Sequence, residues 1–196
     1  MHTLRSRLTV AASLMVLVGP ATAQKKTAPS DAQYMVQVLS AAPKGITQDA
    51  TVVRMGADGA MKTLREGKNG FTCMIVDGNK MCADANSLAF FDAFMKRQPP
   101  PDKLGLTYML AGDDGASNTD PTATSKSADN HWVVTGPHIM VVGPGSKALG
   151  LTEDPDPDPT KPYMMWAGTP YEHAMIPVAA VKRLTKSTTP AKSETK

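Results

Sequence analysis

Residues 130–145 read NHWVVTGPHIMVVGPG, the densest run of apolar residues, glycine and proline in the chain. Residues 163–178, YMMWAGTPYEHAMIPV, repeat its order of features: a tryptophan, a break at glycine and proline, a His-x-Met unit and then aliphatic residues. Both stretches are too apolar for surface loops. We therefore expect both to enter one β-sheet, as neighbouring strands.

Short β-branched and aromatic runs separated by turn signals predict the other strands. Asp-Gly and Asn-Gly pairs at 58–59, 69–70 and 77–78 are typical of tight hairpins, whose central residues need positive φ. They divide residues 51–82 into four strands, which we expect to form an antiparallel meander. Further strands are predicted at 104–110, 131–135, 139–142, 163–166 and 174–178.

The third hairpin predicts a disulfide. If Asp77 and Gly78 form a two-residue turn, counting back along both strands places Cys73 opposite Cys82. This is a non-hydrogen-bonded pair, whose Cα atoms lie about 4.5 Å apart. A disulfide tolerates about 4.4–6.8 Å. We therefore expect Cys73 to be bonded to Cys82.

Residues 84–98 predict the principal helix. Asp84 or Asn86 can cap its start, and Leu88, Phe91, Phe94 and Met95 form one apolar face. The prolines at 99–101 end it. The predicted fold is a single α+β domain, mainly an antiparallel β-sheet with this helix packed on it.

The N-terminus of the chain predicts export. Residues 1–23 have the basic start, apolar run and Ala-Thr-Ala site of a signal peptide. We expect a flexible linker at 24–33, the globular domain at 34–181 and a disordered basic tail at 182–196. No later segment has the roughly 20 apolar residues of a membrane span. The protein is therefore predicted to be periplasmic or secreted.

The charge distribution argues against a nucleic-acid partner. The net charge of +3 comes from the signal peptide and the tail, so the domain between them is mildly acidic. A polar stretch at 111–130 is long for a loop without structure, and such loops are often functional. The sequence names no partner for the protein.

The candidate metal-binding side chains are those of histidine and methionine. No catalytic motif is present, whereas methionine is common, with 13 residues. On a strand, His138 with Met140 and His173 with Met175 would each present an imidazole and a thioether on one face. These are plausible Cu(I) ligands, and His131 could complete the patch.

Three functions remain open. The first, which we favour, is a non-catalytic binding or structural domain without a cofactor. The second is copper binding through the His and Met pairs. The third is an enzyme in which His131 or His173 acts as a general base, beside Asp129 or Glu172.

Three sequence segments are similar to those of other proteins: GFTCM at 70–74, DNHWVVTGPHIMVVG at 129–143 and PYMMWAGTPYEHAMIPV at 162–178. With these, the chain resembles a group of small exported bacterial proteins with no assigned activity. The resemblance covers residues 70–178 and implies export and a single domain. It carries no catalytic residues to transfer.

Overall fold

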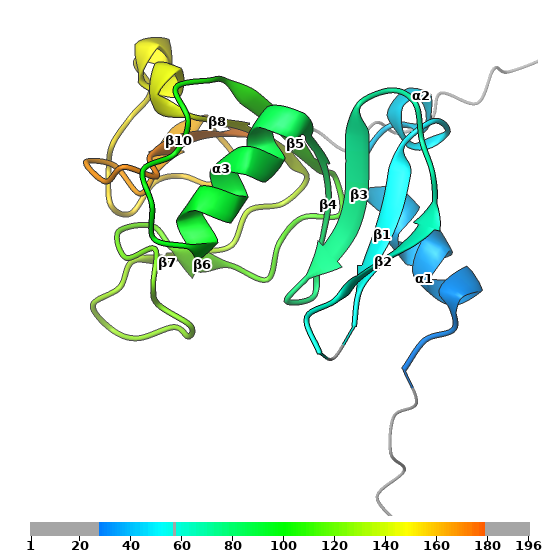
Figure 1. The fold of residues 1–196 in the computed structure, drawn as a ribbon. Coiled ribbons are helices and arrows are strands. Elements are labelled where there is room, and N and C mark those ends of the chain that lie inside the picture. The colour runs from blue at the N-terminus through cyan, green and yellow to red at the C-terminus, as the bar shows by residue number, and fades with distance from the viewer. Residues whose placement is uncertain (1–27, 57, 179–196) are drawn as a thin grey trace, which may run out of the picture.

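A mixed eight-stranded sheet forms the centre of the protein, with strand order β2-β1-β3-β4-β5-β8-β10-β9 (Figure 1). The computed structural model describes residues 28–56 and 58–178, so the predicted signal peptide and basic tail lie outside the described residues. The strands are β1 (Thr51–Met55), β2 (Met61–Arg65), β3 (Phe71–Val76), β4 (Asn79–Asp84), β5 (Gly105–Met109), β8 (His138–Val142), β9 (Tyr163–Met165) and β10 (His173–Pro177). The predicted α+β class is confirmed.

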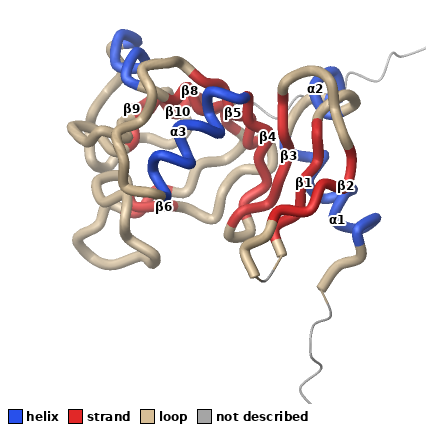
Figure 2. The backbone as a smooth tube through the Cα atoms, in the orientation of Figure 1, coloured by secondary structure: helices blue, strands red, loops and turns tan. Residues whose placement is uncertain are grey.

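Short helices and a two-stranded sheet complete the fold (Figure 2). The helices are α1 (Asp31–Val38), η1 (Leu39–Ala41), α2 (Lys44–Thr47), α3 (Ala85–Met95) and η2 (Pro144–Leu149). The small sheet pairs β6 (Ala116–Ser117) with β7 (Trp132–Val133), so the polar stretch at 111–130 contains a strand. None of the helices in the described ranges is long and apolar enough to cross a membrane.

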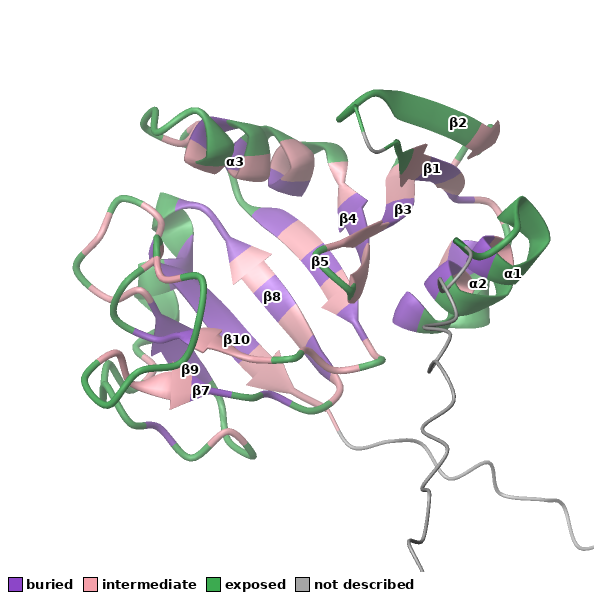
Figure 3. Ribbon diagram, turned by 90° about the horizontal axis from the view of Figure 1, so that it is seen from below, coloured by how far each residue is buried: buried purple, intermediate pink, exposed green. Residues whose placement is uncertain are grey.

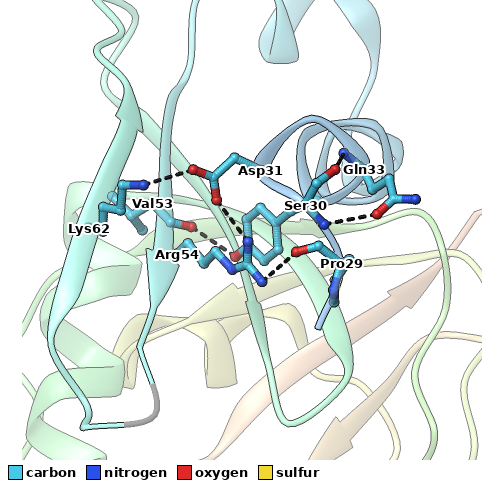
Figure 4. Close-up of polar contacts among 8 residues, drawn as sticks. Pro29, Ser30, Asp31, Gln33, Val53, Arg54 and Lys62 are labelled. Atoms are coloured by element: carbon cyan, nitrogen blue, oxygen red, sulfur yellow. Dashed lines mark hydrogen bonds and ion pairs between the residues drawn. The ribbon is translucent and has the colours of Figure 1, made fainter. Parts of the chain in front are cut away.

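The helix α1 packs on one face of the sheet and is fixed there by polar contacts. Ser30 caps its first turn and forms a capping box with Gln33. Asp31 forms ion pairs with Arg54 and Lys62 at 2.8 and 2.7 Å (Figure 4). The helix therefore begins at Asp31, within residues 24–33, which were predicted to be a flexible linker.

The hairpin β3–β4 has the predicted register. Asp77 and Gly78 both have positive φ, as a two-residue turn of this kind requires. Cys73 faces Cys82 and is bonded to it. The disulfide prediction is confirmed.

The predicted meander is wrong at its second strand. β1 pairs with β2 on one side and, in parallel, with β3 on the other, so β2 lies at the edge of the sheet. The chain after β2 crosses the start of β1, where Lys68 N donates to Asp49 O at 2.8 Å. Gly67 allows this crossing, because a Cβ there would lie 2.1 Å from Thr51 N.

The helix α3 packs on the opposite face from α1 (Figure 3). Of the two predicted caps, Asp84 is the one used: its carboxylate accepts from Ser87 N at 2.7 Å. Phe90 is its most buried large side chain, at 1% exposure. None of the residues of the predicted apolar face is fully buried: Phe91 packs against the core, and the face as a whole lines a groove between the helix and the sheet.

Candidate functional site: a methionine-lined groove

A groove of about 500 Å³ runs between α3 and the sheet. Nine methionines line it: Met55, Met61, Met74, Met81, Met95, Met109, Met140, Met165 and Met175. We call this space the methionine groove. Of the other four methionines, Met1 and Met15 lie outside the described residues, and Met35 and Met164 do not line the groove. Methionine is thus concentrated in one place.

The methionine groove receives one methionine from each of the eight strands of the main sheet and one, Met95, from α3. The strand register explains how they meet. Three pairs lie directly opposite each other across neighbouring strands: Met55 with Met61, Met74 with Met81 and Met140 with Met175. Opposed residues share a face, so these side chains all point to the α3 side.

The groove is open at one end and closed at the other. Met55, Met61 and Met95 are 48%, 50% and 76% exposed and form the rim. Met109, Met140, Met165 and Met175 are buried and form the floor. Aromatic rings add to the wall, where Phe94 and Trp166 stack with centroids 5.1 Å apart. The groove therefore leads from solvent into the core.

His138 lies on the floor with one ring nitrogen unpaired. Its Nδ1 is 2.7 Å from Gly136 O. A carbonyl oxygen only accepts, so Nδ1 carries the proton and Nε2 presents a lone pair. Nε2 is buried and has no hydrogen-bond partner among the described residues. Burial lowers the pKa of His138, which favours the neutral ring.

Asp113 faces this nitrogen. Its Oδ2 lies 3.9 Å from His138 Nε2, beyond hydrogen-bonding distance. Its Oδ1 accepts from Thr135 N at 2.9 Å and from Gly115 N at 3.0 Å. Burial raises the pKa of the Asp113 carboxyl, while these two hydrogen bonds and His138 oppose the rise. A carboxylate oxygen and an imidazole lone pair therefore face each other across a narrow gap.

His173 occupies the other end of the floor, among aromatic rings. Its Nδ1 lies 2.9 Å from Tyr171 O, which again places the proton on Nδ1. Its ring meets Trp166 and Phe90 edge to face, with centroids 4.9 and 6.1 Å apart. Burial lowers the pKa of His173 to about 4. Its neutral imidazole is packed as part of the wall.

The two His-x-Met strands are neighbours, as predicted. His138 and His173 both line the methionine groove, with Met140 and Met175 between them. Because β8 and β10 are antiparallel, the two histidines lie at opposite ends of the Met140–Met175 pair, four residues apart along the strands. At about 3.3 Å per residue this is about 13 Å between Cα atoms along the strand axis. The two imidazoles share a groove and lie at separate positions in it.

His131 lies elsewhere. It precedes β7, with a positive φ of 47°, and does not line the groove. Its Nδ1 contacts Asp156 Oδ2 at 2.9 Å on a partly exposed surface. The patch of three histidines expected from the sequence is therefore not formed.

The acidic residues named with the proposed general bases have other partners. Glu172 accepts from Gly168 N at 2.7 Å and lies 3.4 Å from Lys147 Nζ. The side chain paired with His131 is Asp156, in place of Asp129. Among the described residues, neither His131 nor His173 is hydrogen-bonded to a Ser, Thr or Cys side chain.

Sequence reasoning missed most of the groove. The hairpin register that placed Cys73 opposite Cys82 also places Met74 opposite Met81 on the other face. This methionine pair could therefore have been predicted from the sequence. Asp113 gave no such signal, because it reaches His138 from a loop 25 residues away.

The methionine groove is not a conventional metal centre. The described residues contain no group of three or more His, Cys, Asp or Glu side chains that could hold a metal ion. Comparison with protein-family models, curated proteins and solved structures finds no match to this chain. The geometry of the groove is thus the basis for a functional proposal.

Proposed function

We propose that this protein is an exported, non-catalytic binding protein whose ligand lies in the methionine groove. The observation that carries the proposal is the set of nine methionines lining one groove. Methionine is flexible and polarisable, so it adapts to a ligand better than branched aliphatic side chains do, and it is over-used at binding surfaces.

The shape of the groove supports binding. Ligand sites are concave, mostly apolar, and contain a few polar groups that fix orientation. Here the walls are mainly thioethers and aromatic rings. Asp113, His138 and His173 are the polar groups toward the floor, and Asp77, Asn79 and Asp92 also line the groove. A volume of about 500 Å³ lies within the usual range for ligand pockets, about 300–1,000 Å³.

Export is supported from two sides. Residues 1–23 have the pattern of a signal peptide, and Cys73 and Cys82 form a disulfide of the kind that persists in oxidising compartments. The resemblance to small exported bacterial proteins agrees with both.

Binding of an uncharged fluorophore tests the proposal. N-phenyl-1-naphthylamine brightens in apolar surroundings, and we expect the folded protein to bind it. The double variant Met61→Glu/Met95→Glu places two carboxylates at the rim and should weaken binding about tenfold, roughly 1.4 kcal/mol.

A matched control uses apolar residues of equal exposure away from the groove. Leu149 and Val36 are 51% and 77% exposed, against 50% and 76% for Met61 and Met95. Leu149→Glu/Val36→Glu should bind the fluorophore as the wild type does. Equal binding by all three proteins would place the fluorophore outside the groove and contradict the proposal.

A further inference from the structure

We propose that the methionine groove binds a soft monovalent cation, Cu(I), at its floor, through His138 Nε2 and the thioethers of Met109, Met140 and Met175. The inference rests on the proposed function and names the ligand class of the same groove. Four features of the described residues carry it.

The first feature is the orientation of His138. Histidine ligands of metals generally donate their second ring N–H to a carbonyl or carboxylate, which fixes the tautomer. His138 does this through Nδ1 to Gly136 O at 2.7 Å. The remaining lone pair, on Nε2, is buried without a partner in the described chain. A buried acceptor left unsatisfied costs about 1–3 kcal/mol, so this arrangement needs an explanation.

The second feature is the set of neighbours of His138 on the same face of the sheet. Met109 lies directly opposite it on β5, and Met140 lies two residues further along β8. Met175, paired with Met140, is the diagonal neighbour on β10. Directly opposed Cβ atoms lie about 4.5–5.5 Å apart and diagonal neighbours about 7–8 Å apart, within reach of long side chains. Three thioethers thus surround one imidazole, and thioethers select Cu(I).

The third feature is charge. A cation in an apolar groove needs a counter-charge. Asp113 Oδ2 faces His138 Nε2 at 3.9 Å, and the groove floor brings no Lys or Arg beside it. Asp77 and Asp92 also line the groove but are exposed, so one carboxylate, Asp113, balances one monovalent ion at the floor. A divalent ion would leave an uncompensated positive charge in low-dielectric surroundings.

The fourth feature is a route of thioethers to the site. Met74 pairs with Met81. The pairing of Cys82 with Tyr108 makes Met81 the cross-strand neighbour of Met109, which in turn faces His138. Met74, Met81 and Met109 thus form a continuous row of buried or partly buried thioethers that ends at His138. A Cu(I) ion can pass along it without leaving soft ligands.

Anaerobic titration of the metal-free exported protein with Cu(I), in competition with bicinchoninate, tests the inference. We expect one Cu(I) per molecule, held more tightly than about 10 μM. Loss of a group that only supports a metal ligand typically costs about 10–100-fold in affinity, and loss of the ligand itself should cost at least as much. Met140→Leu, Met175→Leu and His138→Ala should therefore each weaken binding at least about tenfold.

Two matched controls come from the same residue types. Met164 is buried on β9 but does not line the groove, and His131 pairs with Asp156 outside it. Met164→Leu and His131→Ala should bind Cu(I) as the wild type does. X-ray absorption of the copper-loaded wild type gives a readout that needs no variant to fold: it should show sulfur ligands together with one imidazole nitrogen.

The outcomes separate the two proposals. Fluorophore binding in the groove without Cu(I) binding tighter than about 10 μM would overturn the metal inference and leave the proposed function standing. Loss of both would overturn both. Cu(I) binding unaffected by the His138, Met140 and Met175 variants, or a copper spectrum without sulfur, would also overturn the inference.

Discussion

The two faces of the sheet use sulfur in opposite ways. In β3 and β4, Cys73 and Cys82 point to the α1 side, and the adjacent Met74 and Met81 point to the α3 side. On the first face the sulfurs are cross-linked and fully buried. On the second face the thioethers line an open groove. The comparison indicates that one face provides stability and that the other is available to a ligand.

Packing on the two faces agrees with this division. On the α1 side, Val38, Ala41 and Val52 are completely buried around the disulfide. On the α3 side, the helix covers the sheet through Phe90 but leaves Met95, one turn and a half further on, 76% exposed. Together with Met55 and Met61, which are 48% and 50% exposed, Met95 forms an exposed apolar rim around the groove.

The largest expected effect comes from removing the cross-link. Cys73→Ser/Cys82→Ser should lower the free energy of unfolding by about 3 kcal/mol, because a disulfide constrains the unfolded chain even across a short loop. Urea unfolding of the oxidised wild type and the variant measures it. The groove should still bind the fluorophore in the folded variant. Identical unfolding curves for the two proteins would contradict the assignment of stability to this face.

The second effect is the loss of one hydroxyl on the same face. Tyr34 Oη donates to Val53 O at 2.8 Å and accepts from Ile75 N at 2.9 Å. Tyr34→Phe leaves both backbone groups without this partner, which should cost about 2 kcal/mol. Tyr171→Phe is the matched control, since its exposed hydroxyl makes one hydrogen bond, to Gln98 O at 3.1 Å. We expect a cost under about 0.5 kcal/mol there, and equal costs for the two variants would show that burial of the Tyr34 network is unimportant.

Local signals predicted the parts of the fold that depend on local geometry. The turn at Asp77 and Gly78 set the register of its hairpin, and Asp84 set the start of α3. The parallel pairing of β1 with β3 was missed because it depends on a crossing in which Gly67 packs against the backbone at Thr51. No property of the two strands themselves records that contact.

The candidate site was predicted only in part for the same reason. His138 and His173 were identified from a pattern within each strand, and the neighbouring strands brought them to one groove. Asp113 and Met109 reach that groove from other segments, so no spacing in the sequence links them to His138. His131 was included through its closeness in sequence, but β7 belongs to the second sheet and carries it away.

The smallest expected effect separates packing from ligand binding on the α3 side. Met140→Leu conserves volume in a buried position, and such exchanges usually cost less than about 1.5 kcal/mol. Met164→Leu, on the other face of the sheet in β9, two strands away, should cost about the same. Urea unfolding of both variants should therefore give similar midpoints, while only Met140→Leu loses affinity for Cu(I). If Met140→Leu instead lost several kcal/mol and Met164→Leu did not, the Met140 thioether would be needed for the fold, and the division between a stabilising face and a binding face would fail.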